Sequence, residues 1–396
     1  MSYDALLILV LIGVFALLVL YFNKMLKSPK QIIGAALMIA AAFAVRGFFL
    51  SHETLDYQDF LSVWVQYFAD HGGWSAIAHP IGNYNVPYMY FLALFSYAGI
   101  RDLYLIKLLS IFFDVILAWA VMRLIEDFNG SKSRMLIGFF VTLILPTVLL
   151  NGSYWGQCDS IYVAFALLGL DLALRNKPTI SMIMFACSFA FKLQAVFILP
   201  IIAVLLIRKK YKWWHLLVFP TTYIVLVLPA VLAGFPLKDA ITLYLDQADT
   251  VGTGLNYNSP SVFSLIPSVP NVDFAGKIGI VAAFTVVAVI CILELTLKPR
   301  TNRSLFGAAL VFSIAIPFLL PHMHERYFFM ADTLTLAAAF ISPGYFILSL
   351  LSQFASLLGY HAYLRGYYLY PMSYGGLALL AASLLAFIFY LTSKNK

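Results

Sequence analysis

The sequence predicts an all-α, polytopic bundle of transmembrane helices, and two observations carry that prediction. The chain of 396 residues is 62% hydrophobic and 11% charged, whereas an ordinary soluble domain is about half apolar and a quarter charged. Apolar runs of about 20 residues, the length that crosses a bilayer, recur from Leu6 to Thr392 with short polar breaks between them. We therefore expect one membrane domain over residues 1–396 with no separate soluble unit.

The basic residues fall in a few short loops, which sets the expected orientation. Under the positive-inside rule these loops lie in the cytoplasm. They are "NKMLKSPK", "NGSKSR", "RNKP", "RKKYK", "KPRTNR" and the tail "SKNK". The net charge of +7 is thus explained by topology, so no nucleic-acid partner is expected. The N-terminus is expected outside the cytoplasm and the C-terminus inside it.

About thirteen spans follow from that orientation. Residues 1–50 hold two of them, near 5–22 and 31–50, and residues 51–103 form a large outer loop. The segment 85–100 is expected not to cross, because it is short and rich in Tyr and Phe, as an interfacial helix is. The remaining spans, within 104–396, are placed near 104–124, 135–150, 159–174, 178–191, 194–208, 213–233, 277–297, 304–320, 328–342, 344–358 and 371–391.

The unusual polar sequence gathers on the outer side of this topology. Polar residues at membrane depth are costly unless they line a cavity or find partners, so such clusters are functional candidates. Their convergence predicts one site at the extracytoplasmic face of a cell membrane. The outer pieces are 51–103, 151–160, 191–194, 234–276, 321–327 and 360–371.

Several of these pieces together resemble a known family. The segments are "DYQDFLSVW", "NYNVPYMYFLAL", "NGSYWGQCDSIY", "FKLQAVFILP", "NYNSPSVFSLIP" and "LLPHMHERYFFMAD". In this order, over residues 51–335, they resemble bacterial membrane glycosyltransferases of the GT-C type, closest to the branch related to the GPI mannosyltransferases. The resemblance implies transfer of a sugar from a polyprenyl-phosphate donor to a cell-envelope glycan or lipid-linked acceptor outside the cytoplasm. It also implies an acidic residue at the membrane edge of the first outer loop, a place that Asp56 matches. The additional span before that loop departs from the family pattern.

Chemistry gives Asp56 a reason that is independent of the resemblance. A sugar hydroxyl that displaces a phosphate needs a base for its proton, whereas the phosphate leaves without being protonated. One carboxylate is enough, and a single displacement inverts the anomeric centre. We expect Asp56 to be the general base and Asp59 to bind the acceptor or orient Asp56. Alternatively, both aspartates cap an interfacial helix.

A donor phosphate needs cations, and the outer face provides few. Arg326 can bind two phosphate oxygens at once, and Lys192 supplies a point charge. His324 and His322 lie beside Arg326 in the same segment. The alternatives are an ion pair between Arg326 and a carboxylate such as Glu325, and a Lys192 that reaches to the interface. The string "HMHE" makes a divalent metal conceivable but not favoured, because it lacks a spaced second pair of ligands. No cofactor is expected with certainty.

Polar and aromatic side chains of the other outer pieces are candidates for binding the sugar or the acceptor. Indole and phenol rings stack on sugar faces, and amides and carboxylates bind hydroxyls. The alternative for each is structural, as a helix cap, an aromatic anchor or part of a packed loop. The candidates are Trp155, Gln157, Asp159, Tyr84, Asn85, Gln194, Gln247, Asn258 and Glu325.

Acidic residues within the spans are expected to pair with Lys or Arg; they are Asp114, Asp171, Glu294 and Asp332. Three cysteines without a CxxC pair argue against a disulfide framework. No GxGxxG or Walker A motif is present, which favours a lipid-linked donor over a soluble nucleotide sugar. Two other functions remain open at this stage: a transporter or flippase of lipid-linked sugars, and a polymerase of envelope polysaccharide.

Overall fold

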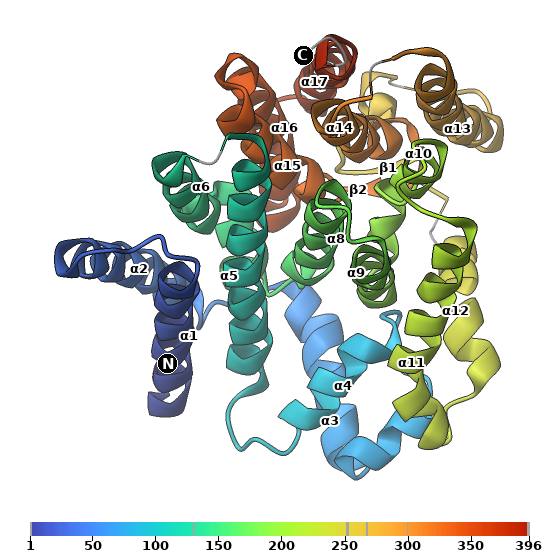
Figure 1. Cartoon of the computed structure of the whole chain (residues 1–396). Helices are drawn as coiled ribbons and strands as arrows, with labels where there is room; N and C mark the ends of the chain where they lie inside the picture. The colour runs from blue at the N-terminus through green and yellow to red at the C-terminus, as the bar shows by residue number, and fades with distance from the viewer. Residues whose placement is uncertain (1, 130, 251–252, 267, 299, 394–396) are drawn as a thin grey trace.

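Helices make up almost all of the computed structural model (Figure 1). It describes residues 2–129, 131–250, 253–266, 268–298 and 300–393, apart from the side chains of residues 129 and 245–250. Within these ranges, the two β-strands are two residues long each. The predicted all-α, polytopic bundle is confirmed.

Eight helices in the described part of the chain are long and apolar enough to cross a membrane. A ninth candidate is a pair bent by 43°, made of α6 (Lys132–Ile144) and the short helices α7 (Pro146–Val148) and η3 (Leu149–Trp155). The eight are α1 (Tyr3–Phe22), α2 (Pro29–Phe49), α5 (Asp102–Asn129), α11 (Val218–Leu232) with η5 (Trp213–Leu217), α13 (Val272–Thr296), α14 (Asn302–Leu319), α16 (Phe346–Arg365) with η7 (Pro343–Tyr345), and α17 (Met372–Thr392).

The other expected spans coincide with shorter helices. They are α8 (Asp159–Leu174), α9 (Pro178–Phe191), η4 (Leu193–Phe197) followed by α10 (Ile201–Ile207), and α15 (Phe329–Ile341). Each is shorter than the roughly 20 residues that a lone span needs. Helix α8 is buried along almost its whole length, packed against α5 and α9. These helices are shorter because they end at an internal site, described below.

The first outer loop holds short helices, as expected. They are η1 (Tyr57–Leu61), α3 (Ser62–Asp70), η2 (Gly73–Ala78) and α4 (Val86–Phe95). The ten residues of α4 are too few to cross a bilayer. Trp64 and Phe68 in this loop are buried within the protein, so they do not anchor it in a membrane interface.

The long connection after α11 is tied to the segment that follows α14. It contains α12 (Leu237–Thr250), β1 (Asn256–Tyr257) and η6 (Val262–Leu265). Strand β1 pairs in parallel with β2 (Met323–His324), with Tyr257 opposite His324. The pairing fixes the two long outer pieces to one another, a contact that the sequence did not predict.

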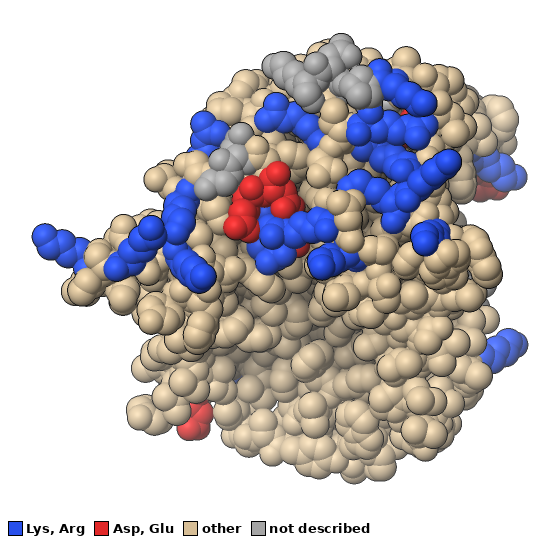
Figure 2. All heavy atoms as spheres, in the orientation of Figure 1, with Lys and Arg blue, Asp and Glu red and all other residues tan. Residues whose placement is uncertain are grey.

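Charge divides the molecule into two ends. Figure 2 shows Lys and Arg gathered over the upper part of the molecule, where α5 ends and α6 begins. The opposite ends of the same helices lead to the predicted site segments. Helix α8 begins at Asp159, α9 ends just before Lys192, and α14 ends just before residues 321–327. The predicted gathering of these segments at one end is therefore observed.

Three of the four acids within the spans pair with arginines, as expected. The pairs are Arg46 with Asp114 at 3.1 Å, Arg123 with Asp171 at 2.8 Å, and Arg208 with Glu294 at 2.9 Å. The expectation for Asp332 is wrong. Its Oδ1 accepts hydrogen bonds from two serine hydroxyls of α16, Ser352 at 2.6 Å and Ser356 at 3.0 Å. Neutral donors therefore replace the expected cation.

Candidate active site

A cavity of about 770 Å³ lies where the outer pieces meet. Its volume is in the range of small-molecule sites. Polar side chains from six segments line it together with apolar ones such as Phe191, Phe197 and Ile280. The predicted site residues among its walls are Asp56, Tyr84, Asn85, Gln157, Lys192, Gln194, His322, His324 and Arg326.

Three donors hold the carboxylate of Asp56 at the cavity wall. The indole Nε1 of Trp155 donates to Oδ2 at 2.9 Å, and the amide Nε2 of Gln157 donates to the same oxygen. The hydroxyl of Tyr363 donates to Oδ1. A carboxylate has about four lone-pair sites, so three are occupied and one, on Oδ1, is left. The carboxylate is thus fixed in orientation and can still accept a proton.

The backbone around Gly156 explains how two neighbouring side chains reach one oxygen. The π-helix η3 ends at Trp155, and Gly156 then adopts a left-handed conformation with φ of 86°. Glycine takes that conformation without the strain of a side chain. The sharp turn brings Gln157 back toward Asp56, on which Trp155 already converges. The sequence places residues 151–160 among the outer pieces but gives no sign of a π-helix there.

Trp155 also links the carboxylate to a cation. Its ring stacks on Tyr363, with centroids 4.8 Å apart, and the Arg326 guanidinium carbon lies 5.4 Å from its centroid. The side chain is fully buried, so it cannot stack on a sugar as expected. Its position instead makes Trp155 the connection between Asp56 and Arg326.

Lys192 is buried beside Asp159 at the start of α8. Its ammonium forms an ion pair with Asp159, which also accepts a hydrogen bond of 2.7 Å from Asn151. Burial alone would lower the pKa of Lys192, but the neighbouring carboxylate outweighs that effect and raises the pKa above its ordinary value. Lys192 is therefore a permanent cation at the cavity wall. It does not reach toward the interface, which was the alternative expectation.

Arg326 is held by Glu325. Its Nη1 donates to Glu325 at 2.9 Å, and its Nε lies 3.9 Å from Asp159. The ion pair that the sequence analysis named as the alternative is thus present. Within the described part of the chain, the buried Nε nevertheless has no hydrogen-bond acceptor within reach. A buried donor without a partner is rare in folded proteins, and an arginine N–H forms strong hydrogen bonds with anionic oxygens.

The two histidines differ in their roles. His324 stacks on Tyr257, with centroids 4.8 Å apart, and is one-third exposed toward the cavity. His322 uses its Nδ1 for the carbonyl of Gly254 at 2.7 Å. His324 is therefore the better placed of the two to contact a ligand. The hydrogen bond of His322 instead joins residues 321–327 to the connection that follows α11.

Tyr84 belongs to the network around Asp56. Its hydroxyl donates to Oε1 of Gln157 at 3.0 Å, and the Lys192 ammonium lies 5.4 Å from its ring centroid. Burial raises the pKa of Tyr84 to about 12, so it remains a donor at neutral pH. The buried Oε1 of Gln194 accepts no hydrogen bond from any described residue.

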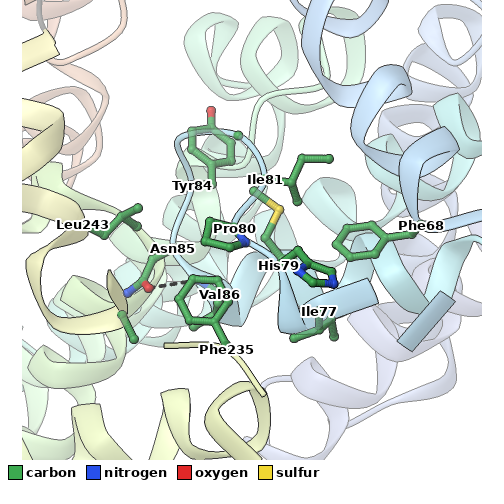
Figure 3. A pocket seen from close by; sticks show the side chains of 13 residues that line it. Phe68, Ile77, His79, Pro80, Ile81, Tyr84, Asn85, Val86, Phe235 and Leu243 are labelled. Atoms are coloured by element: carbon green, nitrogen blue, oxygen red, sulfur yellow. Dashed lines mark hydrogen bonds between the residues drawn. The ribbon is translucent and has the colours of Figure 1, made fainter. Parts of the chain in front are cut away.

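Asn85 lines the cavity, but protein groups use its polar atoms. Its Nδ2 donates to the carbonyl of Ala190 and to the hydroxyl of Tyr223, both at 3.0 Å, and its Oδ1 accepts from the N–H of Val86 at 2.9 Å. A second cavity of about 20 Å³ lies beside it (Figure 3). That volume holds about one water molecule and is too small for a sugar. The sequence expectation that Asn85 contacts sugar or acceptor gains no support from this geometry.

The remaining predicted site residues do not line the large cavity. Asp159 and Glu325 are buried behind Lys192 and Arg326 and hold them. Asp59 is exposed on η1, and Asn258 accepts a hydrogen bond of 2.5 Å from Tyr368. The side chain of Gln247 lies outside the described residues.

Sequence reasoning missed Tyr363 and Tyr257, which both line the cavity. Tyr363 is one of five tyrosines in "YHAYLRGYYLYP", and the segment gives no reason to choose it over the others. Tyr363 lies far from Asp56 in the sequence, so the contact between them could not be inferred from the sequence. The pattern of the β1 and β2 segments is too short to signal strands. Only tertiary structure distinguishes these residues from their neighbours.

No three His, Cys, Asp or Glu side chains gather as metal ligands among the described residues. The cavity instead presents one held carboxylate near two fixed cations. Such a set can accept a proton at one atom and attract an anion at others.

The comparisons with known proteins agree with this chemistry. No curated protein matches the chain. Residues 91–208 match the family model described as alpha-(1->6)-mannopyranosyltransferase, N-terminal domain. The matched stretch contains Trp155, Gln157, Asp159 and Lys192. The resemblance to GT-C mannosyltransferases is thereby confirmed, and the match supports a glycosyltransferase built into a membrane-type helix bundle.

Proposed function

We propose that this protein transfers one sugar from a polyprenyl-phosphate-linked donor to a cell-envelope glycan or lipid-linked acceptor, at the extracytoplasmic face of the cell membrane. The observation that carries the proposal is the placement of Asp56. Three donors fix its carboxylate in the wall of the cavity that Lys192 and Arg326 also line. The proposed base and the two proposed phosphate-binding cations thus line the same cavity.

In the proposed reaction, the acceptor hydroxyl attacks the anomeric carbon of the donor sugar. The bond from that carbon to the phosphate oxygen breaks, and the phosphate keeps the electron pair. Asp56 takes the hydroxyl proton on its remaining lone pair. Since the phosphate monoester has a second pKa near 6, it leaves as an anion without a general acid. One displacement inverts the anomeric configuration.

The cations have a separate task in this reaction. The charge on the phosphate grows as the bond breaks, so fixed positive groups stabilise the transition state more than the ground state. The unpartnered Nε of Arg326 and the ammonium of Lys192 are the groups proposed for it. His324 and Gln194 complete the wall and are proposed to contact the phosphate and a sugar hydroxyl.

The orientation follows from charge. The basic loops lie at the ends of the helices opposite the cavity, and the positive-inside rule assigns such loops to the cytoplasm. The cavity is then proposed to open on the outer side, where a lipid-carried sugar can meet a water-side hydroxyl.

The test compares two aspartate variants of the purified protein in lipid nanodiscs. A panel of radiolabelled polyprenyl-phosphate sugars is supplied with envelope-lipid acceptors, and the sugar in the product is counted. We expect transfer to fall at least about a hundredfold in Asp56→Asn with donor binding retained. The matched control is Asp59→Asn, whose exposed side chain lies outside the cavity and is expected to transfer normally. No transfer from any donor would refute the donor class, and equal transfer by wild type and Asp56→Asn would refute the base.

A further inference from the structure

Lys107 is a fully buried lysine that the proposed reaction does not use. It lies in the first half of α5, and its ammonium donates to three backbone carbonyls. These belong to Phe49 at 2.9 Å, His52 at 2.5 Å and Tyr154 at 2.9 Å. Among the described residues it forms no ion pair within 4.0 Å.

Three carbonyls match the three N–H donors of a protonated lysine. A neutral amine has two N–H groups and a lone pair, so it would leave one carbonyl without its donor. Burying a polar nitrogen is costly unless it is hydrogen-bonded. The geometry therefore offers acceptors for up to three N–H groups and places the Lys107 nitrogen at one defined point.

The three carbonyls come from the two sides of the Asp56 network. Phe49 ends α2, and His52 lies in the segment that leads to Asp56. Tyr154 comes directly before Trp155, the indole donor to Asp56. Lys107 thus ties the segment that carries the base to the segment that carries its donors.

Two further contacts hold the donor segment, one from the Asp56 segment and one from α5. The hydroxyl of Thr54 donates to the carbonyl of Trp155 at 3.0 Å, and that of Ser110 donates to the carbonyl of Gln157 at 2.7 Å. Ser110 follows Lys107 by three positions, so both lie on one face of α5. That face acts as a support for residues 154–157.

We propose that Lys107 is a positioning residue that sets the register between Asp56 and its donors Trp155 and Gln157. The inference rests on the proposed function, since it concerns how the proposed base is held. Without the ammonium, the carbonyls of Phe49, His52 and Tyr154 lose a common donor and separate. Asp56 then shifts relative to the acceptor hydroxyl, and a shift of about 1 Å can cost a hundredfold in rate.

The kinetic test is a double-mutant cycle. Lys107→Met is expected to lower kcat about tenfold to a hundredfold, with the KM for the donor changed less than about twofold. In the Asp56→Asn background, the same change is expected to lower the residual rate less than about threefold, because the group that Lys107 positions is gone. Unchanged kcat in Lys107→Met, or an equal loss in both backgrounds, would overturn the proposal.

A matched control exists at the other end of the bundle. Lys210 donates to the carbonyls of Ala173 and Leu174 at 3.3 Å and to the side-chain oxygens of Asn176 and Asn302. Lys210→Met removes a comparable set of contacts far from the cavity. It is expected to leave kcat unchanged, so a kcat loss equal to that of Lys107→Met would overturn the proposal.

A measurement without turnover keeps the test independent of activity. The indole N–H signal of Trp155 is identified in a ¹⁵N-labelled sample by its absence in Trp155→Phe. In the milder variant Lys107→Gln it is expected to shift in the direction seen in Asp56→Asn, since the hydrogen bond to Asp56 weakens in both. An unmoved signal in Lys107→Gln would overturn the positioning role. Failure of the proposed function would appear separately, as unchanged transfer by Asp56→Asn.

Discussion

The hydroxyl of Tyr363 donates a hydrogen bond to the carboxylate of Asp56 across 307 positions of the chain. The contact joins the first outer loop to the end of α16. The same phenol ring stacks on Trp155, which donates to the other oxygen of Asp56. One aromatic pair thus holds both carboxylate oxygens.

Tyr363→Phe is expected to reduce kcat about tenfold to a hundredfold. The change removes one charge-assisted hydrogen bond, worth about 1.5 to 3 kcal/mol, and keeps the ring stacked on Trp155. The measurement is steady-state transfer at saturating donor. The matched control is Tyr367→Phe in the same segment, whose side chain is 58% exposed. Equal rates for wild type and Tyr363→Phe would contradict this role.

Asp159→Asn is expected to lower the free energy of unfolding by about 3 to 5 kcal/mol, because it leaves Lys192 buried without its anion. Asp159→Asn with Lys192→Met should recover more than half of that loss. Denaturant unfolding in detergent measures both. Glu53→Gln, which breaks the exposed pair with Arg101, is the control and should cost less than about 1 kcal/mol.

The same pair predicts a pH dependence. The pKa of Lys192 in the folded protein lies above its ordinary 10.5. Its contribution to stability is therefore complete below pH 10.5 and is lost as the pH rises through the higher pKa of the folded state. Wild type should lose stability over that alkaline interval relative to the variant Asp159→Asn with Lys192→Met. Parallel pH profiles for the two proteins would contradict the assignment.

Arg326→Lys is expected to weaken donor binding more than tenfold. Lysine keeps the charge but loses the planar fork that can bind two phosphate oxygens. Equilibrium binding of a labelled donor to the Asp56→Asn background isolates this effect from turnover. Arg134→Lys, an exposed change among the basic loops, should leave the affinity unchanged. An unaltered affinity in Arg326→Lys would remove this arginine from the phosphate site.

Chelation is expected to leave transfer unchanged. In the proposed site, Lys192 and Arg326 take the place of the divalent ion that supplies positive charge in other phosphate sites, and the described residues offer no cluster of three metal-type side chains. Transfer is measured with excess EDTA and again after adding Mg²⁺ or Mn²⁺. Loss of activity that a metal restores would place a metal ion in the reaction.

Orientation can be tested in intact cells with a membrane-impermeant maleimide. Gln58→Cys, exposed in the first outer loop, should be labelled, and Lys132→Cys, exposed at the basic end, should be labelled only after lysis. The native cysteines Cys158 and Cys187 are buried, and the unchanged protein provides the background. The reverse labelling pattern would invert the proposed topology.

Much of the fold was predictable because bilayer crossing demands long apolar runs. The lengths of the helices were less predictable from the sequence. Helices α8 and α9 are as apolar as true spans, yet they end where Asp159 and Lys192 meet inside the protein. An apolar run does not reveal whether lipid or protein surrounds it, so counting runs does not identify which ones cross alone.

The candidate site was predictable where a charged residue stands within or beside an apolar run, as Asp56, Lys192 and Arg326 do. It was not predictable where the choice depends on tertiary contacts. Trp155 is a residue type that often stacks on sugars, but Tyr363 and Arg326 cover the faces of its ring. Asp332 was expected to form an ion pair, but its carboxylate accepts hydrogen bonds from two serines of α16 instead.

The basic loops and the cavity lie at opposite ends of the same helices, and this separation constrains the supply of substrate. Under the proposed function, a sugar loaded onto its lipid carrier from a soluble nucleotide sugar begins in the leaflet beside the basic loops. Its head group must be translocated to the other leaflet before it can reach Asp56. The spent lipid phosphate must return by the same route to be reloaded. If the proposed function holds, the protein acts downstream of a flipping step, and its product in cells should increase and decrease with the rate of that step.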